Sequence, residues 1–315
     1  MDEKFQLLAR LENLMDQVEE IARSLADAIA SLEVTEEPTE EYPEDPTDPV
    51  EEPVYSSYVR YSGSTQPSTN YIVDSDQDII WVNSDDVVLN IQARVETINV
   101  MGVSGLSIIG NEEGLVGTIH VQKRSYNIKV EGLSMFGNKE SGYAFNFNGG
   151  AEFVHLNALS ITCDAYAIWA NDCTDFIVEN CVMETVDKGN GLDQATVRFV
   201  DCSSVSLAHC ALISNLKHCF RIHGESSSFQ LSWCEFSGEG NGVMLGGRGE
   251  AVTGVVFDQC LFKAEGPDLL NVDENSVQNL SLLRCEFVLR HGWNPYEHVS
   301  NVVNGTFEDN TVTVI

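Results

Sequence analysis

The chain has 315 residues, 43% of them hydrophobic, and carries a formal net charge of −32. Such acidity argues against nucleic acid or an anionic membrane surface as a partner, because each attracts a basic protein surface. No run of about 18 apolar residues is present that could insert into a membrane, and the N-terminus shows no basic segment leading into an apolar one. The sequence therefore predicts synthesis in the cytoplasm without a secretory signal.

Residues 1–33 are predicted to form one helix with a heptad pattern of apolar residues. Spacings of three and four residues alternate without a break along Leu8, Leu11, Met15, Val18, Ala22, Leu25, Ile29 and Leu32. A further apolar column widens this stripe and consists of Leu7, Leu14, Ile21 and Ala28. A stripe of this width predicts a trimer or larger bundle, or a helix that docks on another protein. The alternative is a helix that folds back onto its own domain.

Residues 34–54 are predicted to be an extended spacer. They contain five of the chain's eight prolines and nine acidic residues, with neither lysine nor arginine. Proline and charge repulsion both extend a chain, and such a segment cannot bury a core. Residues 55–100 alternate short strands with polar turns, and they are interpreted as a region that caps the first coil of the module beyond.

Residues 101–315 contain a repeat of roughly 25 residues, and this period governs the fold prediction. The fourth position of the repeated motif is held by Leu106, Leu133, Leu159, Cys181, Cys210, Cys234, Cys260, Cys285 and Asn310. Each repeat contains three short stretches in which apolar and polar residues alternate, such as Phe220-Arg221-Ile222. Because side chains alternate across a strand, the outer members of each stretch are predicted to point inward and the middle one outward.

The motif strings LSWCEF (231–236), FDQCLF (257–262) and LLRCEF (282–287) resemble the right-handed parallel β-helix superfamily that includes pectin-lyase-like proteins. This resemblance implies an all-β solenoid of about nine coils with three strands per coil, one coil for each copy of the motif. It implies little about activity, because the motif residues are core residues. The nine cysteines are accordingly interpreted as buried thiols and not as metal ligands or disulfides, and no metal or cofactor is predicted.

Outward residues of successive coils should form columns, because stacked strands lie about 4.8 Å apart. The first column is predicted to consist of His120, Asn146, Trp169, Arg198, Arg221, Met244 and Asn271. Trp169 beside Arg198 and Arg221 resembles a sugar-binding face, since aromatic rings cover pyranoses and guanidinium groups donate hydrogen bonds. An ordinary mixed surface or a subunit contact would give the same pattern.

Two further columns have small and apolar residues in their middle, which favours a covered face such as a threefold interface. The second column is predicted to be Lys129, His155, Ile177, Ser206, Gln230, Val256 and Ser281. The third is predicted to be Ser107, Ser134, Ser160, Val182, Ala211, Glu235, Leu261, Glu286 and Thr311. Neither column carries an evident reactive group.

Catalysis would need a different arrangement, because glycoside hydrolysis requires two carboxyl groups about 5 Å or about 6.5 to 9.5 Å apart. Glu239 and Glu265 each follow the repeat cysteine by five residues in neighbouring coils, so they are the candidate pair. The alternative is two solvated turn residues. A lyase of this superfamily would show clustered aspartates, and the stretch with Arg221, His223 and Glu225 lacks such neighbours. An enzyme is therefore the weaker prediction.

The order of helix, spacer and β-helix resembles that of bacteriophage tail spikes and head fibres. This resemblance implies a virion structural protein, such as a fibre, a tail spike or a capsid decoration. The expected assembly is a homotrimer attached to other virion proteins through the N-terminal helix. Host-surface polysaccharide is the expected ligand, with no nucleic acid and no membrane insertion. The alternative is a phage depolymerase that cleaves polysaccharide, whereas a bacterial adhesin would need an export signal.

Overall fold

The structure of the chain is a computed structural model. It describes residues 59–60, 69–111, 113–137, 142–186, 195–215, 218–246, 251–266, 269–273, 277–289 and 302–314. The chain divides into two units, residues 1–54 and 55–315, and all of the described residues belong to the second. The predicted heptad helix and the acidic spacer therefore lie outside the described residues.

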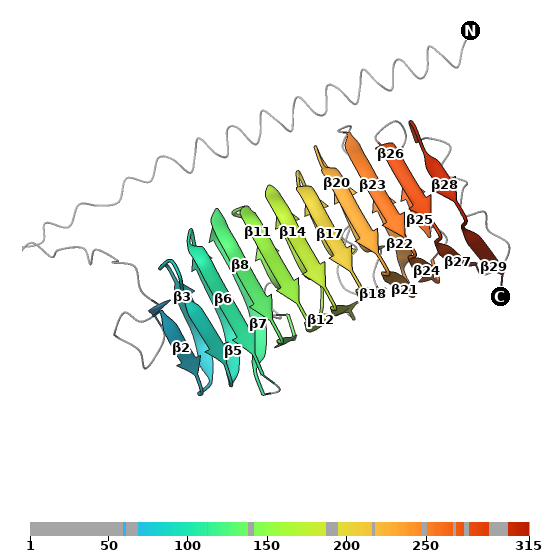
Figure 1. The fold of residues 1–315 in the computed structure, drawn as a ribbon. Coiled ribbons are helices and arrows are strands. Elements are labelled where there is room, and N and C mark those ends of the chain that lie inside the picture. Colours follow the sequence, from blue (N-terminus) through green and yellow to red (C-terminus); the bar gives the residue numbers. More distant parts are fainter. Residues whose placement is uncertain are drawn as a thin grey trace, which may run out of the picture. The chain divides into compact units, whose positions relative to one another are not determined.

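The described residues form a parallel β-solenoid, in which strands stack coil upon coil from β2 to β29 (Figure 1). Three ladders of parallel strands run along it. The first ladder consists of β3 (Gln77–Val82), β5 (Arg94–Met101), β7 (Leu115–Lys123), β10 (Tyr143–Phe147), β13 (Tyr166–Asn171), β16 (Ala195–Val200), β19 (His218–His223), β22 (Asn241–Leu245) and β25 (Leu270–Val272). One antiparallel strand, β1 (Val59–Arg60), pairs with β3.

The other two ladders complete each coil. The second ladder consists of β2 (Asn70–Val73), β4 (Val88–Ile91), β6 (Ser104–Gly110), β8 (Ser125–Glu131), β11 (Ala151–Asn157), β14 (Cys173–Glu179), β17 (Ser203–Ala208), β20 (Ser227–Ser232), β23 (Val252–Asp258), β26 (Val277–Leu283) and β28 (Thr306–Glu308). The third ladder consists of β9 (Ser134–Met135), β12 (Ser160–Cys163), β15 (Val182–Thr185), β18 (Ala211–Ser214), β21 (Glu235–Gly238), β24 (Leu261–Ala264), β27 (Glu286–Leu289) and β29 (Thr311–Val314).

The inward residues of all three ladders fill the interior of the solenoid. Phe220 and Ile222 are completely buried on either side of the outward Arg221, which confirms the predicted alternation. Equivalent residues of successive coils stack because parallel strands hold them about 4.8 Å apart. Phe262 and Phe287 illustrate this, with ring centroids 4.6 Å apart and planes 10° apart. Each buried phenylalanine contributes about 1.5 to 3 kcal/mol relative to an exposed one.

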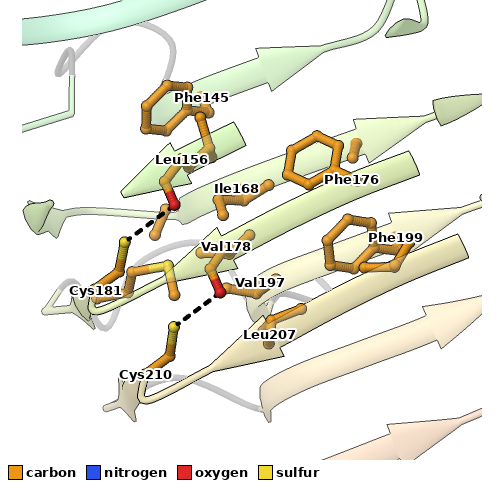
Figure 2. Packing of buried hydrophobic residues seen from close by; sticks show 14 of the residues in the cluster. Phe145, Leu156, Ile168, Phe176, Val178, Cys181, Val197, Phe199, Leu207 and Cys210 are labelled. Carbon is orange, nitrogen blue, oxygen red and sulfur yellow. Dashed lines mark hydrogen bonds between the residues drawn. The ribbon is translucent and has the colours of Figure 1, made fainter. Parts of the chain in front are cut away.

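The repeat cysteines lie where the second ladder passes into the third, and all nine cysteines of the chain are buried, as predicted. Their thiols lie within hydrogen-bonding distance of a carbonyl oxygen of the preceding coil and of one two residues earlier in the chain, which for Cys181 is the oxygen of Glu179 at 3.0 Å. The Sγ of Cys181 lies 3.9 Å from the oxygen of Leu156, and that of Cys210 lies 3.6 Å from the oxygen of Val178 (Figure 2). Buried carbonyls need donors, so the cysteine column is part of the backbone hydrogen bonding.

The structure differs from the sequence prediction at the start of the solenoid. Leu106 pairs with Ile128 and Ser107 with Lys129, so the first motif copy forms a second-ladder strand and Ser107 belongs to the second column. Eight of the nine motif copies therefore form the third ladder, so the solenoid has about eight such turns rather than nine. Among the described residues, seven of these turns show all three strands and the eighth shows β28 and β29. Strands of all three ladders alternate inward and outward side chains in the same way. The repeat period alone therefore does not show to which ladder a strand belongs.

The solenoid also begins before residue 101, the start that the sequence predicted. Strands β2 to β5 come from the region predicted to be a cap, and they already pair in parallel with one another and with β6 and β7. They pair in only two of the three ladders, and the third ladder starts at β9. The predicted cap therefore supplies the first coils in a simpler, two-stranded form.

The two ends of the solenoid differ in how well their inward residues are covered. At the first coil, Tyr71 and Val73 are buried. At the last coil, the inward Phe307 and Val314 remain 41% and 60% exposed, although their register partners Leu282 and Leu289 are buried. The inward residues of the last described coil are thus less covered than those of the first.

Candidate functional site

The register of the first ladder confirms the predicted first column and extends it by two residues toward the N-terminus. In order, the column is Trp81, Asn99, His120, Asn146, Trp169, Arg198, Arg221, Met244 and Asn271. The second column is confirmed from Lys129 to Ser281 and the third from Ser134 to Thr311. Trp169 therefore does lie next to Arg198, and Arg198 next to Arg221.

Trp169 is the centre of an aromatic and cationic cluster on this column. The guanidinium carbon of Arg198 lies 4.4 Å from the centre of the indole. The rings of Tyr143 and Tyr166 meet the indole nearly at right angles, at 5.7 and 4.8 Å. These two tyrosines stack on each other at 5.2 Å because they are register partners. Burial raises the pKa of Tyr143 and the nearby Tyr166 raises it further, while Arg198 lowers it.

Solvent reaches this cluster unevenly. Tyr143 and Trp169 are half-buried, whereas Arg198 and Arg221 are each only 6% exposed. The Nε of Arg198 donates to the Nε2 of the buried His223 over 2.7 Å, which requires a neutral imidazole with its proton on Nδ1. Both arginines thus occupy outward positions without lying at the open surface. A ligand on this face would first meet Tyr143 and Trp169.

The two candidate carboxylates lie in neighbouring coils, as the sequence predicted. Glu239 follows β21 and Glu265 follows β24, directly after the paired residues Gly238 and Ala264. The amide of Glu265 donates to the carbonyl of Gly238 over 2.8 Å, so the two backbones are adjacent. Both side chains are exposed. Their exposed positions differ from the enclosed clefts in which enzymes usually hold a substrate.

A second aromatic feature lies at the corner between the second and third ladders. We call it the corner pair, and it consists of His209 and Trp233, each directly before a repeat cysteine. Both residues have left-handed backbone angles, with φ of 55° and 56°. Their rings are nearly parallel, 13° apart, with centroids 6.2 Å apart. The pair was not predicted from the sequence, because the motif strings around Cys210 and Cys234 were interpreted only for their core positions.

Within the described ranges, no three histidine, cysteine, aspartate or glutamate residues lie close enough together to hold a metal ion. In the same part of the chain, no helix is long and apolar enough to cross a membrane.

Comparison with known proteins found likenesses among solved structures. No protein-family model and no curated protein matches the sequence. Among solved structures, the chain is similar to the tailspike protein gp49 of Acinetobacter baumannii bacteriophage Fri1, a capsular polysaccharide depolymerase. The two sequences are 10% identical, and the TM-score is 0.28. The similarity covers 74% of this chain and 57% of the tailspike, so the chain matches little more than half of that protein's length.

Proposed function

We propose that this chain is a structural appendage of a virion, a phage fibre, spike or capsid decoration, whose solenoid binds host-surface glycans. The observation that carries the glycan-binding part is the half-buried pair Tyr143 and Trp169, braced from behind by Arg198. A rigid aromatic ring gives the C–H face of a pyranose an apolar plane at little entropic cost. The parallel ladder fixes both rings, so this surface exists before any ligand arrives.

The structural role is supported by the architecture. A stack of parallel coils with a continuous core is rigid and presents outward residues at a constant spacing. Such a body displays a surface at a distance from its attachment point. In this proposal the helix at residues 1–33 attaches to other virion proteins, and the acidic spacer at residues 34–54 holds the solenoid away from them.

The proposed assembly is a homotrimer, and two observations support it. The heptad stripe of residues 1–33 is wider than a dimer needs. On the solenoid, the outward residues Ile177 and Val182 of the second and third columns are exposed although they are apolar. Burial of such residues against neighbouring copies would be favourable, at roughly 25 cal/mol for each Å² removed from water.

The alternative proposal is a polysaccharide-degrading appendage, which the adjacent Glu239 and Glu265 favour. Their backbones lie in neighbouring coils, about 4.8 Å apart, and a carboxyl separation near 5 Å would suit a retaining hydrolase. A lyase would instead need a base and a group that stabilises the carbanion. A glycan-binding appendage and a depolymerase would use the same solenoid, so the two proposals differ only in whether the bound polymer is cleaved.

The binding proposal is tested with purified full-length chain and immobilised capsular and O-antigen polysaccharides from candidate hosts. We expect Trp169→Ala to weaken binding at least about tenfold. The matched control is Trp81→Ala, because Trp81 occupies the same column several coils away and is also solvent-accessible. Equal binding by the wild type and the Trp169 variant would refute this placement of the ligand.

The cleavage alternative is tested with the same polymers in solution. Chain length is followed by size-exclusion chromatography, and new reducing or unsaturated ends are assayed. If the glutamate pair is catalytic, Glu239→Gln and Glu265→Gln each abolish cleavage, whereas the control Glu286→Gln, an exposed third-column carboxylate, does not. Polymers that bind and stay intact would refute the cleavage alternative and support the binding function.

A further inference from the structure

Trp233 places a large aromatic ring at a corner where the backbone is left-handed. The residue before the fourth motif position has positive φ in coil after coil, and the other non-glycine residues there are Ala158, Asn180, His209, Gln259, Arg284 and Asp309. Asparagine, aspartate and glycine tolerate this conformation, whereas a bulky L-residue there costs roughly 1 to 2 kcal/mol. Trp233 accepts this cost although 55% of it is exposed to solvent. Packing within the solenoid therefore leaves much of the indole open to solvent.

The surroundings of the indole combine an apolar plane with hydrogen-bonding groups. His209 lies one coil earlier, and its ring stacks nearly parallel to the indole. On the other side, Gln259 occupies the same corner one coil later, and Arg284 the coil after that. Arg284 forms two hydrogen bonds with Asp258, at 2.5 and 2.6 Å, which hold both groups at the surface beside this corner.

The spacing of these groups suits a sugar chain lying along the solenoid axis. Successive coils repeat at about 4.8 Å, so Gln259 stands about one spacing and Arg284 about two spacings beyond the indole. A pyranose has an apolar C–H face and a rim of hydroxyls within that reach. The chain's net charge of −32 repels polyanions, which favours an uncharged sugar over an acidic one.

We propose that the corner pair is a carbohydrate-binding subsite for neutral pyranoses, in which the sugar lies on Trp233 and is hydrogen-bonded by Gln259 and the Asp258–Arg284 pair. The inference rests on the proposed glycan-binding function and adds to it a second contact site, on a different corner from Trp169. A polysaccharide that engaged both sites would be held at two points of one rigid body, which raises its apparent affinity.

The test compares Trp233→Ala with Phe153→Ala in the full-length chain. Phe153 is an ideal match, because it is 58% exposed and has a φ of 57°, on a strand three coils away. The probes are oligosaccharides of dextran and mannan as neutral sugars and of hyaluronan as an acidic one. We expect Trp233→Ala to weaken neutral-sugar binding at least about tenfold, Phe153→Ala to leave it within about twofold, and Trp233→Phe to restore most of it.

Circular dichroism and thermal unfolding of each variant check that the solenoid remains folded. Equal binding by the Trp233 and Phe153 variants overturns the inference, and so does a loss confined to hyaluronan. If Trp169→Ala abolishes binding while Trp233→Ala does not, the corner subsite is refuted and the proposed function stands. If only Trp233→Ala loses binding, the corner is supported and the Trp169 site is refuted. A wild-type chain that binds none of the probes or host polysaccharides refutes both.

Discussion

Each repeat cysteine serves the core both as a small apolar group and as a hydrogen-bond donor. The Sγ of Cys260 lies 3.4 Å from the oxygen of Leu231, and that of Cys285 lies 3.5 Å from the oxygen of Phe257. In the last coil the amide of Asn310 takes over this role and donates to the oxygen of Leu282 over 2.9 Å. A buried carbonyl left without a donor costs about 1 to 3 kcal/mol, which explains a polar atom at an interior position.

Alkaline pH should destabilise the fold through its buried thiols. Burial raises the pKa of Cys163 and of Cys219 to about 12 from an ordinary value of 9.0. The unfolded chain therefore releases these protons at a lower pH than the folded chain does. We expect their contribution to the free energy of unfolding to be constant below about pH 9 and to fall between about pH 9 and about pH 12.

Urea unfolding from neutral pH upward measures this effect. The double variant Cys163→Ala and Cys219→Ala should be less stable at neutral pH, because it loses buried volume, but should lose less stability as the pH rises. An alkaline loss as large as that of the wild type would contradict the assignment to these two thiols.

Among the elements, the last coils should show how much packing against a neighbouring coil contributes to the free energy of unfolding. Phe287 on β27 is fully buried and stacks on Phe262, while its register partner Val312 on β29 is 44% exposed. We expect Phe287→Ala to lower the free energy of unfolding by about 3 to 5 kcal/mol. We expect Val312→Ala to lower it by less than about 1 kcal/mol, because the side chain buries little area. Urea unfolding of both variants is the measurement, and equal costs would show that the last coil is covered in solution.

At the scale of the whole molecule, the assembly is expected to depend on the N-terminal heptads. The full-length chain of 34.7 kDa should sediment as a trimer, and deletion of residues 1–33 should leave a monomer. The double variant Leu11→Asp and Ile29→Asp should do the same, because each places a charge in the stripe. Glu20→Ala, outside the stripe, is the control and should leave the trimer intact. A full-length monomer in sedimentation equilibrium would refute the trimer.

Much of the solenoid could be predicted because its core is periodic. The spacing of Cys181, Cys210 and Cys234 gives the length of a coil directly. The alternation of apolar and polar residues around each cysteine indicates which side chains point inward. The first motif copy was assigned to the wrong ladder because Leu106 sits in the same apolar alternation in either one. Only the pairing of Leu106 with Ile128 distinguishes the two.

The candidate site could be predicted only in part. The neighbourhood of Trp169, Arg198 and Arg221 followed from the coil period, because register is a property of the repeat. Their burial did not follow, because it depends on whatever lies over the outward face, and the period carries no information on that. The corner pair of His209 and Trp233 was visible in the motif strings, but its left-handed backbone and its exposure were not.

The repeat, the inward and outward faces of the strands and the burial of the cysteines all follow from local alternation and a constant coil length, so they could be predicted from the sequence. The folded structure was needed to show which ladder each early strand joins, how far Arg198 and Arg221 are covered, and where aromatic rings remain open to solvent. These properties depend on contacts between residues one or more coils apart. A period can place such residues side by side, but it does not determine how their side chains pack or what covers them.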